Sequence, residues 1–354
     1  MKNIITVTGI RPDFIRMSEI FKKLDKEFNH VLIHTGQHFD RLLSDVFFEE
    51  LQIREPDYNL NIGGVGKEHF HQTSELSIKL IELIRNENLN PDIIIFLGDS
   101  NSVVSSVSLK KEGYKIGHIE AGMRSYDKRM LEEINRIVCD HCSDFLFVYH
   151  DNYKNKAIKE NIDSDSIYVV GNTIVEVVNK FKPLRKKLND KIILDIHRPE
   201  NFKHKERLEN IIEYSKLMSL EHNLPLYMLG FKRTIDYIKE FKIDLGDMQV
   251  IDLLPFKKYI DYVYDSKFII SDSGTAQEEP ALLDTPVIVP RDFTERPESI
   301  DNYCSFMIDV NKNNDKSWYN SKKWLTEYSN KKNTEWLGNG KTSDIIVKIL
   351  KNLE

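Results

Sequence analysis

A turn of small polar residues follows an apolar run near residue 270 and has the pattern of an anion site. The run FII at 268–270 gives way to Ser-Asp-Ser-Gly at 271–274, and a second run, PVIV, follows at 286–289. This order predicts a strand, a tight turn, a helix and another strand. Free N–H groups and the dipole at a helix start attract anions, so Ser273 and Gly274 are predicted to bind a diphosphate.

Side chains around this turn add the groups that a nucleotide needs. Carboxylates beyond the turn could accept hydrogen bonds from ribose hydroxyls, and arginines near the next strand could contact phosphate. These residues are Gln277, Glu278, Glu279, Arg291 and Arg296. Ser-Gly alone would favour a capped helix with a solvated acidic face. The glycine turn, the acceptors and the arginines together favour a nucleotide site.

Ionisable residues also occur at the ends of three other predicted strands, where open α/β sheets bind ligands. Asp99 follows the strand at 92–97, and His197 follows the strand at 191–195. Asp99 is either a helix N-cap or a catalytic group, and His197 is either a core histidine or a functional one. Glu120 is predicted on a short buried strand, where a carboxylate is costly unless it is paired or functional.

Further charged groups stand where predicted helices begin. One helix opens with Glu132, Glu133 and Arg136. One of these glutamates is expected to be a helix-end charge, with Arg136 as its ion-pair partner. After the first strand, Arg11 and Arg16 could reach a phosphate. The alternatives are that Arg11 caps a turn and that Arg16 is a solvated helix position.

Strands and helices alternate along the whole chain, which predicts an α/β fold. The four strands of the second half are predicted at 191–195, 224–229, 249–252 and 268–271. A basic connector that contains helix breakers, 181–190, follows the first half. We expect residues 1–172 and a C-terminal helix at 340–354 to form one domain, and residues 173–339 to form the other. Glycine-rich residues 59–72 are predicted to be a loop.

Composition limits the classes of function. A chain of 354 residues is long for one core, and its net charge of −6 gives no general attraction for nucleic acid or an anionic membrane. No apolar run approaches the roughly 18 residues of a membrane span, so we expect a cytoplasmic protein. The single CxxC at 139–142 has no second pair, and we expect it to pack on a helix rather than bind metal.

Ten short motifs occur in the order known from one enzyme family. They are GIRPD (9–13), TGQH (35–38), GDSNS (98–102), HIEAGMRS (118–125), EEINR (132–136), GNT (171–173), HRPEN (197–201), SDSG (271–274), QEE (277–279) and TERPE (294–298). The chain therefore resembles the non-hydrolysing UDP-N-acetylglucosamine 2-epimerases over nearly its whole length. One motif would be weak, whereas ten in register are specific.

The resemblance implies two Rossmann-like domains that face across a cleft, as in the glycosyltransferase B fold, in a homodimer without NAD or metal. The family's catalytic residues correspond to Asp99, Glu120, Glu132 and His197. Its UDP-sugar contacts correspond to Arg11, Arg16, Arg136, Phe256, Ser273, Gly274, Glu279 and Arg291. The family's reaction removes the C2 proton, expels UDP to leave a 2-acetamidoglucal, and adds UDP back with the opposite configuration at C2.

Departures from the family pattern leave the substrate and the regulation open. Residues 61–72 lack an arginine that helps bacterial members hold a second, activating UDP-N-acetylglucosamine, although Gln37 and His38 of that allosteric site are present. Other UDP-2-acetamido sugars, such as 6-deoxy-L-hexoses or 2,3-diacetamido uronic acids, are alternative substrates. A hydrolysing 2-epimerase, a UDP-sugar-dependent glycosyltransferase and a non-catalytic nucleotide-sugar binder are the alternative functions.

Overall fold

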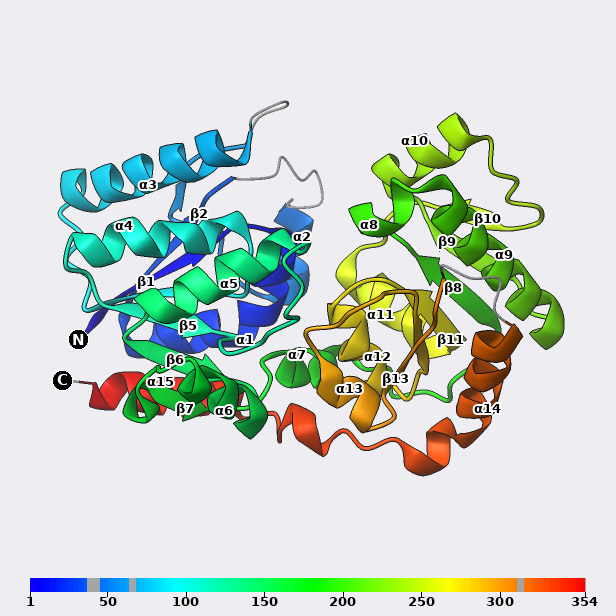
Figure 1. The fold of residues 1–354 in the computed structure, drawn as a ribbon. Coiled ribbons are helices and arrows are strands. Elements are labelled where there is room, and N and C mark those ends of the chain that lie inside the picture. Colours follow the sequence, from blue (N-terminus) through cyan, green and yellow to red (C-terminus); the bar gives the residue numbers. More distant parts are fainter. Residues whose placement is uncertain (37–44, 64–67, 311–314, 354) are drawn as a thin grey trace. The chain divides into compact units, whose positions relative to one another are not determined.

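The computed structural model of the chain describes residues 1–36, 45–63, 68–310 and 315–353 (Figure 1). The chain forms two compact units: unit 1 comprises Met1–Val177 and Leu337–Glu354, and unit 2 comprises Val178–Trp336. The predicted domain boundary at 172/173 stays a prediction. Gln37 and His38 lie outside the described residues. No helix in the described part of the chain is both long and apolar enough to cross a membrane.

Unit 1 is built on a seven-stranded parallel sheet with the strand order β3-β2-β1-β4-β5-β6-β7. Its strands are β1 (Asn3–Thr8), β2 (Asn29–His34), β3 (Tyr58–Asn59), β4 (Ile93–Leu97), β5 (Ile116–Ile119), β6 (Phe145–Val148) and β7 (Ile167–Val169). The central strands are almost continuous runs of buried β-branched and aromatic residues, as expected for a parallel sheet that is covered on both faces.

Helices connect the strands of unit 1 and cover its sheet (Figure 1). They are α1 (Arg11–Glu27), α2 (Asp45–Leu51), α3 (His69–Asn86), α4 (Ser106–Lys111), α5 (Leu131–Cys142), α6 (Asp151–Lys159), α7 (Ile174–Phe181), which runs into unit 2, and α15 (Thr342–Asn352). Helices α3, α4 and α5 contribute to one buried cluster with the sheet, and this cluster includes Cys139, which confirms the expected packing role. The C-terminal helix α15 packs along α1, with ion pairs Lys23–Asp344 (2.5 Å) and Lys351–Glu27 (2.6 Å).

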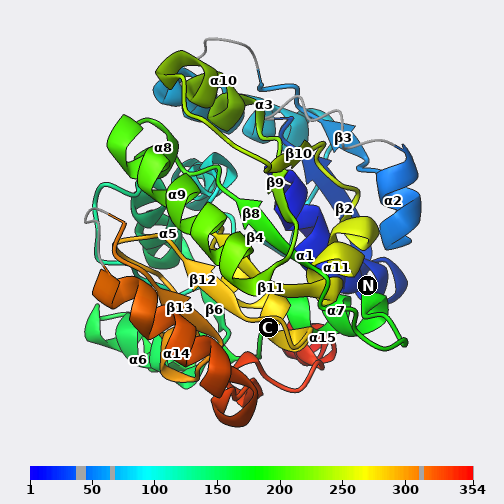
Figure 2. The same ribbon diagram turned by 90° about the vertical axis from the view of Figure 1, so that its right-hand side faces the viewer.

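Unit 2 repeats this architecture on a six-stranded parallel sheet with the order β10-β9-β8-β11-β12-β13. Its strands are β8 (Lys191–Asp195), β9 (Leu226–Leu229), β10 (Gln249–Ile251), β11 (Ser266–Ser271), β12 (Val287–Val289) and β13 (Ser305–Met307). Its helices are α8 (Pro199–Phe202), α9 (Lys205–His222), α10 (Lys232–Phe241), α11 (Phe256–Asp265), α12 (Glu279–Leu282), α13 (Pro297–Asp301) and α14 (Asp315–Lys331). Figure 2 shows α9 and α14 on the same side of the sheet, where a hydrogen bond between the hydroxyls of Tyr214 and Ser321 (2.7 Å) joins them.

Both sheets reverse their strand order at the first strand of the unit, and the turns that follow the central strands meet there. In unit 1 this switch point lies between β1 and β4, and in unit 2 between β8 and β11. Open α/β sheets bind ligands beyond the carboxyl ends of the strands at such a point. The predicted residues Arg11, Asp99, His197 and Ser273 all lie in turns or helix starts that directly follow these four strands.

Two predictions about local structure were wrong. The loop predicted at 59–72 ends earlier, because helix α3 begins at His69 and includes His71 in its first turn. The helix predicted after Gly274 is a 3₁₀ turn, η3 (Thr275–Gln277), followed by the four-residue helix α12. The backbone at Glu278 (φ −120°, ψ −59°) leaves the helical conformation between the two pieces. The macrodipole argument for this turn is correspondingly weaker, because few peptide units are aligned.

Candidate active site

A buried ion pair joins helix α1 to the end of strand β5. Nη2 of Arg16 lies 2.9 Å from Oε2 of Glu120, and the two side chains are 3% and 5% exposed. Glu120 is the residue after the strand and adopts a left-handed backbone (φ 70°), which is uncommon for a residue with a Cβ and occurs often at functional sites. Arg16 is therefore not a solvated helix position, and the predicted buried carboxylate has a partner.

Polar groups at the end of β6 complete this pair. The Tyr149 hydroxyl donates to Oε2 of Glu120 (3.3 Å) and contacts Oγ1 of Thr173 (2.9 Å), and the Arg16 guanidinium lies over its ring. Nη2 of Arg16 also donates to Oδ1 of Asn172 (3.3 Å). The Glu120 carboxylate is thus contacted by Arg16 of α1 and by Tyr149 after β6, and Asn172 and Thr173 in turn hold these two groups.

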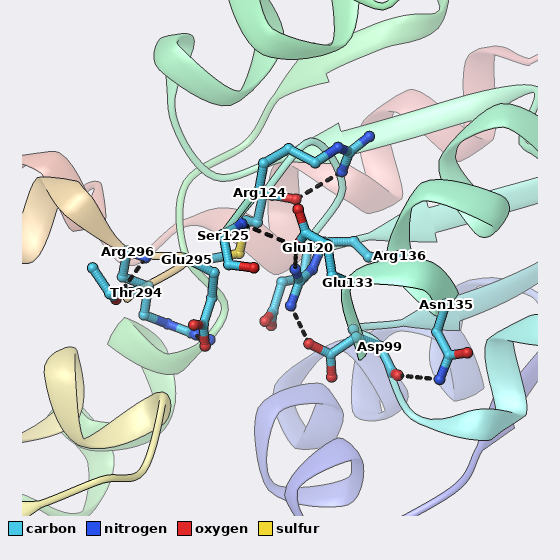
Figure 3. Close-up of polar contacts among 12 residues, drawn as sticks. Asp99, Glu120, Arg124, Ser125, Glu133, Asn135, Arg136, Thr294, Glu295 and Arg296 are labelled. Carbon is cyan, nitrogen blue, oxygen red and sulfur yellow. Dashed lines mark hydrogen bonds and ion pairs between the residues drawn. The ribbon is translucent and has the colours of Figure 1, made fainter. Parts of the chain in front are cut away.

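A second ion pair holds Asp99 beyond the end of β4 (Figure 3). The fully buried Arg136 of α5 contacts Oδ2 of Asp99 through Nη2 and Oε2 of Glu133 through Nη1, the latter at 2.7 Å. Asn135 donates to the backbone carbonyl of Asp99 (2.9 Å). Asp99 is not the N-cap of the following 3₁₀ turn, which is Ser100, and its carboxylate is 25% exposed. A paired but accessible carboxylate can act on a ligand.

Glu133 is the glutamate with the structural role that the sequence left open between two residues. Its two carboxylate oxygens accept hydrogen bonds from the backbone N–H groups of Ser125 and Tyr126 (both 2.9 Å) and from Arg136. Its neighbour Glu132 is half-buried in the first turn of α5. The prediction that one glutamate pairs with Arg136 is confirmed, and Glu132 stays the predicted catalytic one.

The first turn of unit 1 is held by a carboxyl group that the sequence analysis did not single out. Asp13 is buried, and one of its oxygens, Oδ2, accepts from the backbone N–H groups of Gly9 (2.7 Å) and Ile10 (3.1 Å). Burial raises the pKa of Asp13 to about 7, and the charges of Asp99 and Glu120 act in the same direction against the two N–H groups. This coupling shows that Asp13 shares its electrostatic surroundings with both predicted catalytic carboxylates. Arg11, beside it, has its guanidinium 5.2 Å from the centroid of the Phe47 ring.

In unit 2, two carboxylates surround His197. Its Nδ1 lies 3.0 Å from Oδ1 of Asp195 and 3.5 Å from Oδ1 of Asp272, and its ring lies 4.7 Å from that of Phe231. Burial alone would lower the pKa of His197, but the negative charges of Asp195 and Asp272 outweigh it and raise the pKa. His197 is 31% exposed and is therefore not a satisfied core histidine.

The predicted phosphate turn lies beside this histidine in the fold, because β8 and β11 are paired up to Asp195 and Ser271. The Ser273 backbone N–H donates to Oγ of Ser271 (3.1 Å), and the Ser271 hydroxyl donates to Oδ2 of Asp195 (2.9 Å). Gly274 packs so closely that a Cβ there would lie 2.6 Å from Oε1 of Glu295. Only glycine fits this contact without movement of its neighbours.

The arginines of unit 2 are members of a buried network of alternating charge. Nη2 of Arg291 lies 3.0 Å from Oε2 of Glu295, the other oxygen of Glu295 contacts Arg296, and Arg296 lies 2.8 Å from Glu278. All four side chains are at most 4% exposed. Two members of the network, Glu295 and Arg296, pack directly against Gly274 and so support the turn.

The other two predicted contacts in unit 2 are also buried. Glu279 begins helix α12, and Phe256 begins α11 with its ring against Phe181 at 5.4 Å. Their roles toward a nucleotide, like that of Arg291, stay predictions.

Several of these residues were missed in the sequence for an understandable reason. Tyr149, Asp195, Asp272 and Glu295 all contact a residue that was predicted. Their own motifs give no signal of that contact, except that Asp195 and Asp272 end or follow predicted strands.

Three side chains here also have the spacing of a partial metal site, because one ligand atom each of Asp195, His197 and Asp272 lies within 4.8 Å of the others. Asp272, however, accepts backbone N–H groups of His197 and Arg198 and the side-chain amide of Asn201, at 2.8–3.0 Å. Both of its oxygens are engaged in ordering the turn. The geometry fits the support of a histidine better than the binding of a cation.

Comparison with known proteins gives this geometry a context. The sequence model of the family described as UDP-N-acetylglucosamine 2-epimerase matches residues 22–351. The UDP-N-acetylglucosamine 2-epimerase of Methanocaldococcus jannaschii is 33% identical over 365 residues, which cover 97% of each chain. A UDP-2,3-diacetamido-2,3-dideoxy-D-glucuronate 2-epimerase of Pseudomonas aeruginosa is 33% identical over 311 residues, covering 84% of this chain and 85% of that protein.

A solved structure extends the similarity to three dimensions. The crystal structure of the Methanocaldococcus jannaschii UDP-GlcNAc 2-epimerase in complex with UDP-GlcNAc and UDP matches with a TM-score of 0.87 and 32% identity, over 99% of both chains. This match confirms the α/β fold of the glycosyltransferase B type with two Rossmann-like units. Because sequence and fold agree over nearly the entire chain, and not only at the ten motifs, the chain belongs to the UDP-N-acetylglucosamine 2-epimerase family.

Proposed function

We propose that this protein interconverts UDP-N-acetylglucosamine and UDP-N-acetylmannosamine by inverting the configuration at C2 of the sugar. The observation that carries the proposal is the pair of arginine-bound carboxylates, Asp99 and Glu120, at the ends of the neighbouring strands β4 and β5. The similar Methanocaldococcus jannaschii enzyme, whose crystal structure contains UDP-GlcNAc and UDP, supports the choice of substrate.

The reaction needs carboxylates because the C2 proton is a weak acid. A base takes this proton, the C1–O bond to UDP breaks, and a C1=C2 double bond forms in the 2-acetamidoglucal. Re-addition returns a proton to the opposite face of C2 and re-forms the C1–O bond. Two proton-transferring groups on different sides of the sugar ring are therefore required.

Unit 1 offers three carboxylates for the two proton transfers. Asp99 and Glu120 are fixed by Arg136 and Arg16, and Glu132 is half-buried at the start of α5. A fixed carboxylate loses little freedom when the proton moves, which is the advantage of a preorganised site. We propose Asp99, Glu120 and Glu132 as the acid–base set.

Unit 2 offers the groups for the nucleotide. We propose that Ser273 and Gly274 bind the diphosphate, with the Gly274 backbone N–H as a donor because the Ser273 N–H already donates to Oγ of Ser271, and that Glu279 accepts hydrogen bonds from the ribose hydroxyls. His197 stands beside this turn and carries a raised pKa, so it can stabilise the charge that develops on the departing UDP. Arg291 and Phe256 are proposed to line the same pocket, and Arg11 and Arg16 stay predicted UDP-sugar contacts of unit 1.

Incubation with UDP-N-acetylglucosamine in D2O, followed by proton NMR, tests the proposal. We expect the C2 proton signal to disappear by exchange with solvent deuterium while signals of UDP-N-acetylmannosamine grow. Release of UDP with free N-acetylmannosamine would show a hydrolysing 2-epimerase instead. Binding without exchange would leave a nucleotide-sugar binder, or a glycosyltransferase that lacks its acceptor.

The relative from Pseudomonas aeruginosa provides a second substrate arm. UDP-2,3-diacetamido-2,3-dideoxy-D-glucuronate should be tested under the same conditions, because that relative and the Methanocaldococcus jannaschii enzyme share the same identity of 33% with this chain. Faster exchange with the diacetamido sugar would reassign the substrate but leave the chemistry at C2 unchanged.

A further inference from the structure

Asp195, the last residue of strand β8, connects two parts of the proposed nucleotide site of unit 2. Its Oδ1 lies 3.0 Å from Nδ1 of His197, and its Oδ2 accepts the hydrogen bond of the Ser271 hydroxyl at 2.9 Å. Ser271 in turn accepts from the backbone N–H of Ser273. One buried carboxylate therefore holds the imidazole ring on one side and the phosphate turn on the other.

The second carboxylate near His197 has a different task. Asp272 is fully buried, and its oxygens accept from the backbone N–H groups of His197 and Arg198 and from the Asn201 amide. Its Oδ1 lies 3.5 Å from Nδ1 of His197, whereas Oδ1 of Asp195 lies 3.0 Å from the same nitrogen. Asp272 thus orders the backbone after β8, whereas Asp195 makes the short contact with the imidazole.

The remaining groups around the ring do not compete for Nδ1. The Phe231 ring lies 4.7 Å from the imidazole at an angle of 38° and closes one face without a charge. The charged or titratable groups that act on His197 or its partners are Asp195, Asp272, the neighbouring Arg198, and Tyr259 of α11, whose hydroxyl is buried close to Asp195 and Glu279. With Nδ1 engaged, Nε2 is the nitrogen left to meet a ligand.

We propose that Asp195 is a positioning residue: it fixes His197 with its Nδ1 proton bonded inward, so that Nε2–H points to the diphosphate as a charged hydrogen-bond donor. This inference rests on the proposed function and adds the direction in which His197 acts. The arrangement makes His197 a donor to the leaving group rather than the base that removes the C2 proton. It leaves that task to the carboxylates of unit 1.

The electrostatics agree with this arrangement. Burial by itself would lower the pKa of His197, and the charges of Asp195 and Asp272 outweigh burial and raise it, while Arg198 opposes them. A histidine with a raised pKa stays cationic further into the neutral range. Loss of one carboxylate should therefore shift its titration to lower pH.

The first experiment measures His197 in the ligand-free protein, and so does not depend on activity. Two-dimensional ¹H–¹⁵N NMR of the imidazole groups is recorded against pH, with the His197→Gln variant identifying the signal. We expect Asp195→Asn to lower the titration midpoint of His197. Asp236→Asn, which removes a charge on the exposed side of α10, should leave it unchanged. Equal midpoints for wild type and Asp195→Asn would overturn the proposal.

The same spectra of the wild-type protein give a test that needs no folded variant. When the ring becomes neutral, the remaining proton should stay on Nδ1, next to Asp195, and the ¹⁵N shifts report which nitrogen carries it. A neutral form with the proton on Nε2 would contradict the proposed orientation, whether or not Asp195→Asn folds.

Steady-state kinetics then connects the ring to catalysis. We expect Asp195→Asn to lower kcat for UDP-N-acetylglucosamine by roughly tenfold or more at neutral pH and to move the alkaline limb of the kcat profile to lower pH. A shifted NMR midpoint with unchanged kcat and profile would overturn the catalytic part of the inference. If the wild type itself fails to exchange the C2 proton, the proposed function fails while the NMR result still decides the orientation of His197.

Discussion

Two carboxylates of unit 1, Glu120 and Asp99, differ in how much they contribute to the stability of the fold around them. Glu120 and Arg16 are buried together, so removal of either charge breaks a buried ion pair. Asp99 is 25% exposed, and Arg136 keeps Glu133 as a second partner when Asp99 is neutralised. Substitution of Asp99 should therefore lower the activity with little loss of stability, whereas substitution of Glu120 should lower both the activity and the stability.

We predict that Asp99→Asn and Glu120→Gln each lower kcat by at least about 100-fold, as expected for groups that transfer protons. Glu120→Gln should also destabilise the fold, because it removes one charge of a buried ion pair, and breaking such a pair typically costs about 3–5 kcal/mol. Turnover by the NMR assay and thermal unfolding of the same samples measure the two effects. Glu82→Gln, on the exposed face of α3, is the matched control and should change neither. Near-normal turnover in both active-site variants would refute their assignment.

Asp13 gives the stability of the protein a predictable dependence on pH. Its folded-state pKa of about 7 lies above the ordinary value of 3.8, so the unfolded chain loses the proton first as the pH rises. The contribution of Asp13 to stability is therefore complete below about pH 4 and is lost as the pH approaches about 7.

Asp13→Asn should remove this loss, because an amide keeps an oxygen for the N–H groups of Gly9 and Ile10 without a charge to desolvate. Thermal midpoints at pH 5, 6, 7 and 8 should fall with rising pH less in the variant than in wild type. A difference between variant and wild type that does not change with pH would show that the carboxyl group titrates elsewhere.

At the scale of elements, the strands were predictable and some turns were not. Residues 4–8, 92–97 and 268–271 are apolar, β-branched runs between turn residues, and each is a strand to within one or two residues. The helix after Gly274 was not predictable in its length, because the backbone leaves the helical conformation at Glu278 and divides the segment into a 3₁₀ turn and a four-residue helix, which the residue type alone does not indicate.

The site shows the same limit. Sequence motifs located Asp99, Glu120 and His197 at strand ends, since only the order of elements was needed. They could not show that Glu133 pairs with Arg136, because Glu132 and Glu133 lie in the same helical turn and both are within reach of Arg136 by spacing alone.

The connection between β5 and α5 depends on a close approach of two backbones. Gly122 has φ 76°, and a Cβ there would lie 2.6 Å from the carbonyl oxygen of Tyr153 in α6. Gly113 has a similar conformation (φ 89°) but no heavy atom within 4 Å of such a Cβ. An alanine at Gly113 would therefore cause backbone strain alone, whereas an alanine at Gly122 would cause backbone strain and a steric clash.

We predict that Gly113→Ala lowers the free energy of unfolding by about 1 kcal/mol, the cost of a Cβ in the left-handed region. Gly122→Ala should cost clearly more, because the backbone of α6 must also move, and it should displace Glu120 and reduce turnover. Chemical denaturation of both variants checks the order of the two effects. Equal destabilisation would mean that the contact with Tyr153 relaxes without cost.

At the scale of the whole molecule, the stability of unit 1 depends on the last residues of the chain. Helix α15 buries Ile346, Val347 and Leu350 and is tied to α1 by two ion pairs. Leu350→Ala should destabilise the protein by about 2–5 kcal/mol, the range for a large aliphatic residue removed from a core. Lys348→Ala on the exposed face of the same helix should have little effect.

Differential scanning calorimetry measures this prediction, and the transition that shifts should be the one assigned to unit 1. A shift confined to the other transition would mean that α15 contributes mainly to unit 2. If UDP binds to unit 2 as proposed, it should instead raise the midpoint temperature of the transition assigned to unit 2, because a ligand stabilises the native state to which it binds.

Because residues 337–354 return to unit 1 after unit 2 is complete, unit 2 is an insertion within the chain of its host. On the ribosome, the insert is finished before the host, since all of residues 178–336 emerge ahead of α15. Domains generally fold as units during synthesis, so the insert can reach its native state while the host still lacks the helix that covers α1. The proposed acid–base residues are therefore synthesised early in the chain, yet the unit that holds them is the last to be completed.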